Sequence, residues 1–183
     1  HPKHKKINKY IDDKINNSGN NLGFVQYTII PIGPDTTNCM GNSENVTIFV
    51  NPTPQASANQ QLTPGICSGT QTEIELSNNT SGVQVSYTWT AQVTQQPSEG
   101  FLIFDESCDS NCGDSIQKII DNTGHSPAVL KYTITPYIDV CEGIASSSEV
   151  TINPLPDTIS ILGPDHLCRN QTPFFWKRTK FTK

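Results

Sequence analysis

The sequence predicts an all-β protein made of immunoglobulin-like β-sandwich repeats, and three observations support this fold class. Short segments alternate polar and apolar residues with a period of two, which is the pattern of a strand with one buried face. Thr, Ser and Asn supply 52 of the 183 residues, whereas a helical bundle would be rich in Ala, Leu, Glu and Lys. The chain also repeats itself, with an offset of 101 to 109 positions.

The internal repeat consists of five blocks that recur in the same order. The matched pairs are Ile7–Asp12 with Ile116–Asp121, Val25–Pro31 with Leu130–Pro136, Cys39–Gly41 with Cys141–Gly143, Ile48–Pro54 with Val150–Pro156, and Ile66–Cys67 with Leu167–Cys168. We therefore expect residues 1–54 to be the C-terminal half of a preceding repeat, residues 55–156 to be one complete repeat, and residues 157–183 to be the truncated start of a third. The chain begins with His rather than Met, so we expect an internal segment of a longer protein.

The strands of the complete repeat are expected in a simple order. Residues 72–77 alternate in polarity and lead into a polar turn at 77–82, after which residues 83–90 continue the alternation. A strand is expected at 116–120, and the last two strands at 130–135 and 150–152, around a hairpin at 139–148. Trp89 should then be the aromatic centre of the core. Tyr132, and its counterpart Tyr27 in the first half-repeat, should be buried on a late strand.

Two proline motifs, Asn51-Pro-Thr-Pro54 and Asn153-Pro-Leu-Pro156, mark the junctions between these units. Proline restricts φ and cannot donate to a sheet, so both motifs predict short, stiff, extended linkers. Sandwiches joined in this way form a rod, because each unit adds its length while little freedom remains at the joint.

The charges are unevenly distributed along the chain. Nine of the twelve Lys and Arg residues lie in residues 1–14 or 177–183. Between residues 15 and 176 there are 3 basic and 15 acidic residues, a net charge of 3 − 15 = −12. Such a body repels nucleic-acid phosphates, so we expect no nucleic-acid partner. The apolar stretches are far shorter than the roughly 20 residues of a membrane span, so we expect no span either.

The six cysteines predict disulfides in an oxidising compartment, because none of the usual CxxC zinc spacings occurs. Cys108 and Cys112 are close enough in sequence to form a local disulfide. Cys67 and Cys141 each recur once per repeat, which suggests one disulfide within each repeat. A rival scheme pairs Cys39 with Cys67 and Cys141 with Cys168 across the linkers, and free thiols are the third alternative. The expected positions of Cys67 and Cys141 near opposite poles of a sandwich argue against joining them, since the Cα atoms of a disulfide must come within about 7 Å.

The segment Asp105–Asp114 is the one candidate for a metal site. Its Asp109, Asn111 and Asp114 alternate somewhat as calcium ligands do, but the spacing of an EF-hand loop is absent, so a solvated loop is favoured. Ca²⁺ is therefore the only cofactor under consideration. The four His residues are scattered and no nucleophile or metalloprotease motif occurs, so we expect no catalytic residues and no enzyme activity.

The chain carries an ordered set of seven motifs, which are Pro64–Gly69, Tyr87–Thr90, Gly113–Ile116, Asp121–Gly124, Tyr132–Pro136, Cys141–Gly143 and Val150–Pro156. This set resembles the PKD-like domain, which recurs in tandem in secreted and surface proteins of Bacteroidota. The resemblance implies a non-catalytic spacer or adhesive module. It covers almost the whole chain, but the Cys108–Cys112 insertion and the residues after Cys168 depart from the pattern.

The function that follows is an extended spacer or adhesion segment of a secreted or cell-surface protein. Its partners would be the neighbouring repeats of the parent chain and an extracellular protein or glycan. The alternative is a carbohydrate-binding module attached to a catalytic domain elsewhere in the parent protein. Such a module needs an exposed aromatic platform, for which Phe101 and Phe104 are the candidates.

Overall fold

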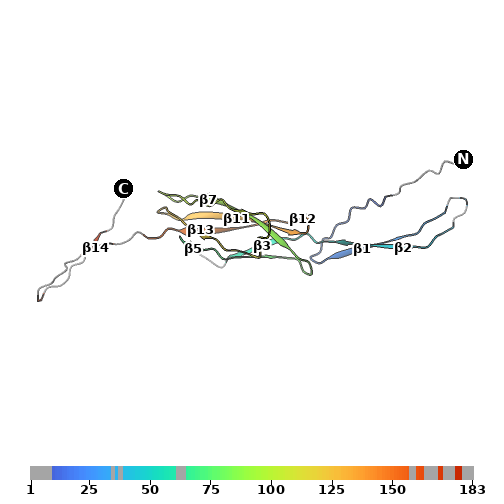
Figure 1. The fold of residues 1–183 in the computed structure, drawn as a ribbon, viewed down its shortest axis with the longest axis horizontal. Coiled ribbons are helices and arrows are strands. Elements are labelled where there is room, and N and C mark those ends of the chain that lie inside the picture. Colours follow the sequence, from blue (N-terminus) through green and yellow to red (C-terminus); the bar gives the residue numbers. More distant parts are fainter. Residues whose placement is uncertain are drawn as a thin grey trace.

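The computed structural model describes residues 10–33, 36, 39–60, 65–156, 160–162, 169–170 and 176–178. These residues form strands and connecting loops, with no helix among them, so the predicted all-β class is confirmed. Figure 1 shows an elongated molecule: a two-stranded hairpin near the N-terminal end, a β-sandwich in the middle, and a second short hairpin near the C-terminal end.

The larger layer of the sandwich is a sheet with the strand order β4-β13-β11-β7-β8. Its long members are antiparallel, and the short β4 joins the edge in parallel. The strands are β4 (Ile66–Cys67), β7 (Ser86–Gln95), β8 (Ser107–Cys108), β11 (Ala128–Ile138) and β13 (Ser146–Asn153), with β12 (Cys141–Glu142) paired to the end of β11. The predicted hairpin between the last two strands is thus present.

The smaller layer contains the sheet β3-β6-β9 and the separate pair β5-β10. Its strands are β3 (Ala56–Gln60), β5 (Thr70–Gln71), β6 (Ile74–Asn78), β9 (Ser115–Ile116) and β10 (Ile119–Ile120). The segment 116–120 is extended, as predicted, but it contributes to two different pairings, β6 with β9 and β5 with β10. Two packed antiparallel layers of short strands are the architecture of an immunoglobulin-like sandwich.

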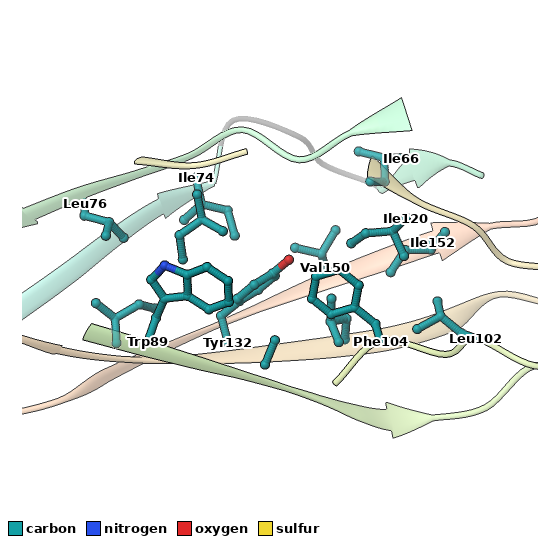
Figure 2. Close-up of a cluster of buried hydrophobic side chains, with 14 of the residues drawn as sticks. Ile66, Ile74, Leu76, Trp89, Leu102, Phe104, Ile120, Tyr132, Val150 and Ile152 are labelled. Carbon is teal, nitrogen blue, oxygen red and sulfur yellow. The ribbon is translucent and has the colours of Figure 1, made fainter. Parts of the chain in front are cut away.

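The core lies between the layers and follows from the alternation along β11. Leu130, Tyr132 and Ile134 are fully buried, and Ile74 and Ile116 cover them from the smaller layer. Figure 2 shows Tyr132 and Ile74 within this cluster of side chains between the sheets. Burial of such side chains contributes about 1.5 to 3 kcal/mol each, and this term holds the layers together.

Two aromatic contacts centre this core on Tyr132. The ring of Trp89 meets it edge-on, with centroids 5.7 Å apart and planes at 71°. Phe104 meets it from another side at 6.2 Å and 68°. Edge-to-face pairs add about 0.5–1.5 kcal/mol beyond the area they bury. Trp89 and Tyr132 therefore occupy the central positions that their alternation predicts.

The N-terminal hairpin consists of β1 (Gly23–Ile29) and β2 (Glu44–Val50). Tyr27 lies on β1 and is only half-buried, so its expected place in a core is wrong for the described structure. Tyr132 is buried because the smaller layer covers it, whereas among the described residues it is the segment around Asp13 that approaches Tyr27. The Tyr27 hydroxyl donates to Asp13 Oδ2 at 3.2 Å, and desolvation and the Asp13 charge raise its pKa.

The C-terminal hairpin pairs β14 (Ser160–Leu162) with β15 (Trp176–Arg178). These six residues, together with residues 169–170, are the described part of the segment 157–183 that the sequence assigns to a third repeat.

Candidate functional site

The joint between the first hairpin and the sandwich is held by several polar contacts among the described residues. Pro52 and Pro54, in the predicted linker, are fully buried. The Ile144 amide donates to the Pro54 carbonyl at 2.7 Å, and the Ala56 amide donates to the Ile144 carbonyl at 3.0 Å. The linker is therefore docked on the sandwich by one backbone hydrogen bond at Pro54, and the bond from Ala56 fixes the start of β3 beside it.

Gly143 makes this docking possible because it has no side chain. A Cβ atom at this position would lie 2.1 Å from the Pro54 carbonyl oxygen and 2.6 Å from its ring. The Gly143 amide also donates to the Pro136 carbonyl at 2.8 Å, which holds the turn in place. Any other residue would have to push the linker away from the sandwich.

A second contact fixes the hairpin at a different point. The Ser81 amide donates to the Asn20 carbonyl at 3.0 Å, and the Ser81 hydroxyl bonds the side chain of Asn21. Asn79 joins this contact to the linker, since its side chain accepts from the Gln55 amide at 2.8 Å. Contacts at two separate places restrict both bending and rotation at the joint.

The segment Asp105–Asp114, here called the acidic loop, contains the predicted disulfide between Cys108 and Cys112, whose Cα atoms are 5.7 Å apart. The prediction of this local disulfide is confirmed. The loop forms one wall of a cleft of about 530 Å³, and strands β7 and β11 together with Asp139, which follows β11, provide the rest. The lining residues are Ser86, Tyr87, Thr88, Asp109, Ser110, Asn111, Tyr137 and Asp139.

The three calcium candidates do not line a common cleft. Asp109 and Asn111 line the cleft beside Tyr137, while Asp114 lines another cleft with Glu73 and Glu75 along β6. Within the described ranges, no group of three or more His, Cys, Asp or Glu side chains could hold a metal ion. The preference for a solvated loop over a calcium site stays a prediction.

Cys67 and Cys141 are exposed free thiols, so the expected disulfide between them is wrong. Cys67 is in register with Asn153 at one end of β13, whereas Cys141 pairs with Ile138 at the far end of β11. The eleven residues of β11 separate the two ends by roughly 30 Å. The rival disulfides, Cys39 with Cys67 and Cys141 with Cys168, are wrong as well, because Cys67 and Cys141 are free thiols. Cys168 itself lies outside the described residues.

Phe101 and Phe104 do not form the expected aromatic platform. Phe104 is buried against Tyr132 in the core, while Phe101 is 60% exposed. Residues 101–104 alternate between exposed and buried positions, so the ring of Phe101 faces solvent and the ring of Phe104 faces the core. Phe101 is therefore the only member of the pair that faces solvent.

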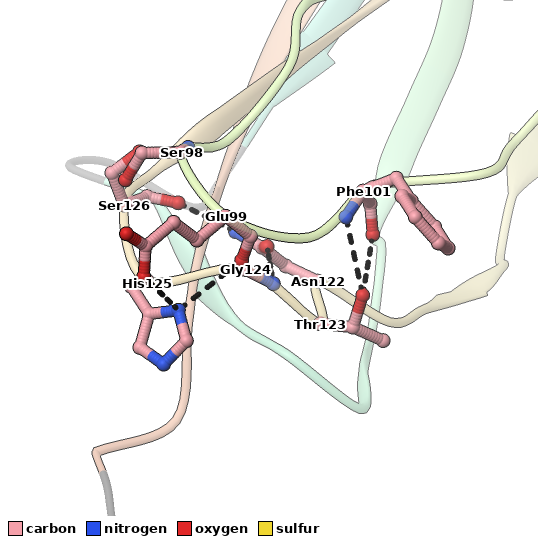
Figure 3. Close-up of polar contacts among 8 residues, drawn as sticks. All are labelled: Ser98, Glu99, Phe101, Asn122, Thr123, Gly124, His125 and Ser126. Carbon is pink, nitrogen blue, oxygen red and sulfur yellow. Dashed lines mark hydrogen bonds and ion pairs between the residues drawn. The ribbon is translucent and has the colours of Figure 1, made fainter. Parts of the chain in front are cut away.

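One site that the sequence analysis missed lies at the pole of the sandwich, around Asn122. Its Nδ2 donates to the carbonyls of Ser126 and Ile152 at 2.9 and 2.8 Å, and its Oδ1 accepts from the Gly124 amide at 2.9 Å. Figure 3 shows the neighbouring contacts, in which Thr123 joins the loop to Phe101. The network links two loops and the end of β13, which is a structural role.

A comparison with family models supplies the affiliation of the chain. The model of the PKD-like domain matches residues 4–54 and again residues 64–156. The chain belongs to the PKD-like domain family. No curated protein matches the chain.

The PKD-like match agrees with the observed sandwich and points to a non-catalytic, immunoglobulin-like module of extracellular proteins. Within the described residues, no helix has the length and apolarity needed to cross a membrane. The first matched region contains the N-terminal hairpin, and the second contains most of the sandwich.

The residues of the joint and of the pole network were visible in the sequence only as parts of motifs. Gly143 stands in the repeated Cys-x-Gly block, and Asn122 stands in Asp121–Gly124 of the PKD-like pattern. A glycine that recurs in a repeat signals a close approach of backbone. Which backbone approaches it could be learned only from the fold.

Proposed function

We propose that this PKD-like chain is a non-catalytic tandem segment of a secreted or cell-surface protein, acting as a stiff spacer that presents its loops or neighbouring modules. The observation that carries the proposal is the docked joint, where Pro54 lies against Gly143 and Ile144. A spacer transmits length only if its joints resist bending. A freely jointed linker of this length would leave its prolines in solvent.

The composition of the surface supports the same role. The body of the chain between residues 15 and 176 has a net charge of −12, which keeps neighbouring molecules apart in solution. The domain organisation expected from the repeats, with half-units on either side of residues 55–156, belongs to this proposal. In a longer array, each junction motif would dock on the Cys-x-Gly turn that follows it in space.

The joint is tested by Gly143→Val in the full chain. The added side chain would collide with Pro54, so we expect the hairpin 23–50 to reorient independently of the sandwich. NMR relaxation of backbone amides measures this motion. We expect the hairpin and the sandwich to share one tumbling time in the wild type, and the hairpin to have a shorter time than the sandwich in the variant.

Glu142→Val is the matched control, because it introduces the same valine side chain one residue earlier, at an exposed position of β12. It should leave a single tumbling time. A wild-type hairpin that already tumbles faster than the sandwich would contradict the spacer proposal.

Glycan binding is the second candidate function. Its candidate site is the cleft beside Tyr137, because Phe101 and Phe104 do not form the aromatic platform that the sequence suggested. Tyr137 is half-buried in that cleft, with the carboxylates of Asp109 and Asp139 on its walls. An aromatic face with nearby carboxylates suits the apolar face and the hydroxyls of a sugar.

A glycan array on the full chain tests this candidate. Binding that is lost in Tyr137→Ala and kept in Phe101→Ala would support the cleft, because Phe101 is exposed but lies outside it. The absence of binding to any glycan would remove this candidate and leave the spacer.

A further inference from the structure

Two chain segments, residues 101–106 and residues 118–123, lie antiparallel at one edge of the sandwich and are here called the edge ribbon. The first segment leads into β8, the edge strand of the larger layer, and the second contains β10 of the smaller layer. Two contacts define the ribbon, and these are the bridge between Leu102 and Asn122 and the 2.6 Å ion pair between Lys118 Nζ and Glu106 Oε2. Both contacts fit a single antiparallel register, because one strand advances by as many residues as the other recedes.

The two faces of the edge ribbon differ, because alternate residues of an extended segment point to opposite sides. The inner side chains are buried, and they are Leu102, Phe104, Ile120 and Asn122. On the outer face, Phe101, Ile103 and Ile119 are 60%, 81% and 67% exposed. Figure 3 shows the ring of Phe101 turned away from the loop residues around Asn122.

The three outer apolar side chains, Phe101, Ile103 and Ile119, form one surface that is here called the Phe101 patch. Phe101 and Ile103 are two positions apart on one strand, so their Cα atoms are about 7 Å apart on the same face. In the register of the ribbon, Ile119 is the diagonal neighbour of Ile103, at roughly 7–8 Å. None of the three belongs to the core cluster. Large apolar side chains gathered on a surface indicate a contact with another molecule.

Two carboxylates flank the Phe101 patch. In the same register, Asp121 lies opposite Ile103 and Asp105 lies opposite Ile119. Both aspartates are exposed, and neither side chain forms a hydrogen bond or an ion pair with any residue that the structure describes. The neighbouring cation, Lys118, is already paired with Glu106.

The charges decide which kind of partner fits this surface. The body between residues 15 and 176 has a net charge of −12, so two copies of the chain repel each other. Face-to-face contact of two Phe101 patches would also bring four carboxylates together, which is unfavourable. A cationic partner is attracted by the same charges and leaves no carboxylate of the patch unpaired.

We propose that the Phe101 patch docks a segment of another protein that carries Lys or Arg beside apolar side chains. The apolar side chains of that segment pack on Ile103 and Ile119, and its cations pair with Asp105 and Asp121. The ring of Phe101 can hold a further cation over its face. The proposal is independent of the stiff joint and of the cleft beside Tyr137, because neither contains a residue of the patch.

NMR titration of the isotope-labelled full chain with short synthetic peptides tests the proposal. The probe alternates lysine and leucine, and two comparison peptides replace its leucines with serine or its lysines with glutamate. The probe should shift the backbone amides of residues 101–105 and 119–123 and bind about tenfold more tightly than either comparison peptide. Its affinity should fall as the salt concentration rises, because the ion pairs are exposed.

Variants on the exposed face separate the two parts of the contact. Ile103→Ser should lower the affinity for the probe by roughly tenfold. Asp105→Asn combined with Asp121→Asn should lower it by a similar factor and should also flatten its dependence on salt. The matched controls are Val140→Ser, at a residue 94% exposed in the turn after β11, and Glu149→Gln, at an exposed position of β13. Both controls should bind the probe as the wild type does.

Several results would overturn the proposal. The first is that the probe shifts no amide of the edge ribbon at millimolar concentration. Equal binding of the lysine–serine peptide would show that the net charge alone attracts the probe. Equal binding of the glutamate–leucine peptide would show that the aspartates do not select the partner. Shifts of the same amides when the protein alone is concentrated would assign the patch to a second copy of the chain instead.

Discussion

At the scale of single residues, Tyr132 shows how much a buried polar atom can cost. Its hydroxyl makes no hydrogen bond within the described structure, although the ring is central to the core. Thr72 lies beside it, but the Thr72 hydroxyl already donates to the Ile116 carbonyl and accepts from the Lys118 amide. Burial is the main cause that raises the Tyr132 pKa to about 12; Thr72 lowers it slightly and the charge of Glu106 raises it.

Tyr132→Phe removes this unpaired hydroxyl while keeping the ring contacts. We expect the free energy of unfolding at pH 7 to rise by about 1 kcal/mol, because an unsatisfied buried group costs about 1–3 kcal/mol. Urea unfolding monitored by tryptophan fluorescence measures the change. A loss of more than about 1 kcal/mol would mean that the hydroxyl has a partner that stabilises the fold.

The same variant predicts a pH effect. The neutral hydroxyl is favoured over the ionised form in the folded protein, so the wild type keeps its full stability below the ordinary tyrosine pKa of 10.0 and loses stability as the pH rises toward 12. Over that window the wild type should lose about 2 to 3 kcal/mol more than Tyr132→Phe. Unfolding curves at pH 9 to 12 give the comparison, and parallel curves would refute the assignment.

At the scale of elements, the strands are positioned by the loops at the poles as well as by the core. Asn122 bonds the end of β13 through the Ile152 carbonyl and holds its own loop through Ser126 and Gly124. It is 5% exposed. The three bonds therefore exist in a setting where water cannot replace them.

Asn122→Ala should destabilise the protein by roughly 2–3 kcal/mol, because it leaves two carbonyls and one amide at the buried pole without their partner. Gln92→Ala, on an exposed position of β7, should change the stability by less than about 0.5 kcal/mol. Thermal unfolding followed by circular dichroism compares the two. Equal destabilisation by the two substitutions would show that the hydrogen bonds of Asn122 do not stabilise the fold.

At the scale of the whole molecule, the division of buried surface predicts which part survives proteolysis. The sandwich buries its apolar side chains, whereas the hairpin exposes Phe24 and Phe49 at 69% and 68%. A protease of broad specificity is required, because only Lys118, Lys131 and Arg169 are basic between residues 15 and 176. Mass spectrometry should find a stable fragment near residues 55–156 and early cleavage within 23–50. Preferential survival of residues 1–50 would contradict this.

The sequence by itself determined the class of the fold, the strands around Trp89 and Tyr132, and the disulfide between Cys108 and Cys112. These features depend on local alternation and short spacing, which a sequence displays directly. The recurrence of whole blocks also located the linkers at residues 51–54 and 153–156.

Only the tertiary structure decided the surroundings of each repeated position. Tyr27 and Tyr132 occupy the same register, yet one is half-buried and the other is in the core, because burial depends on the layer that lies opposite. Cys67 and Cys141 recur in the repeat but lie at opposite poles, and recurrence carries no information about distance. The docking of Pro54 on Gly143 likewise joins residues far apart in the chain, so it arises from packing and not from any local pattern.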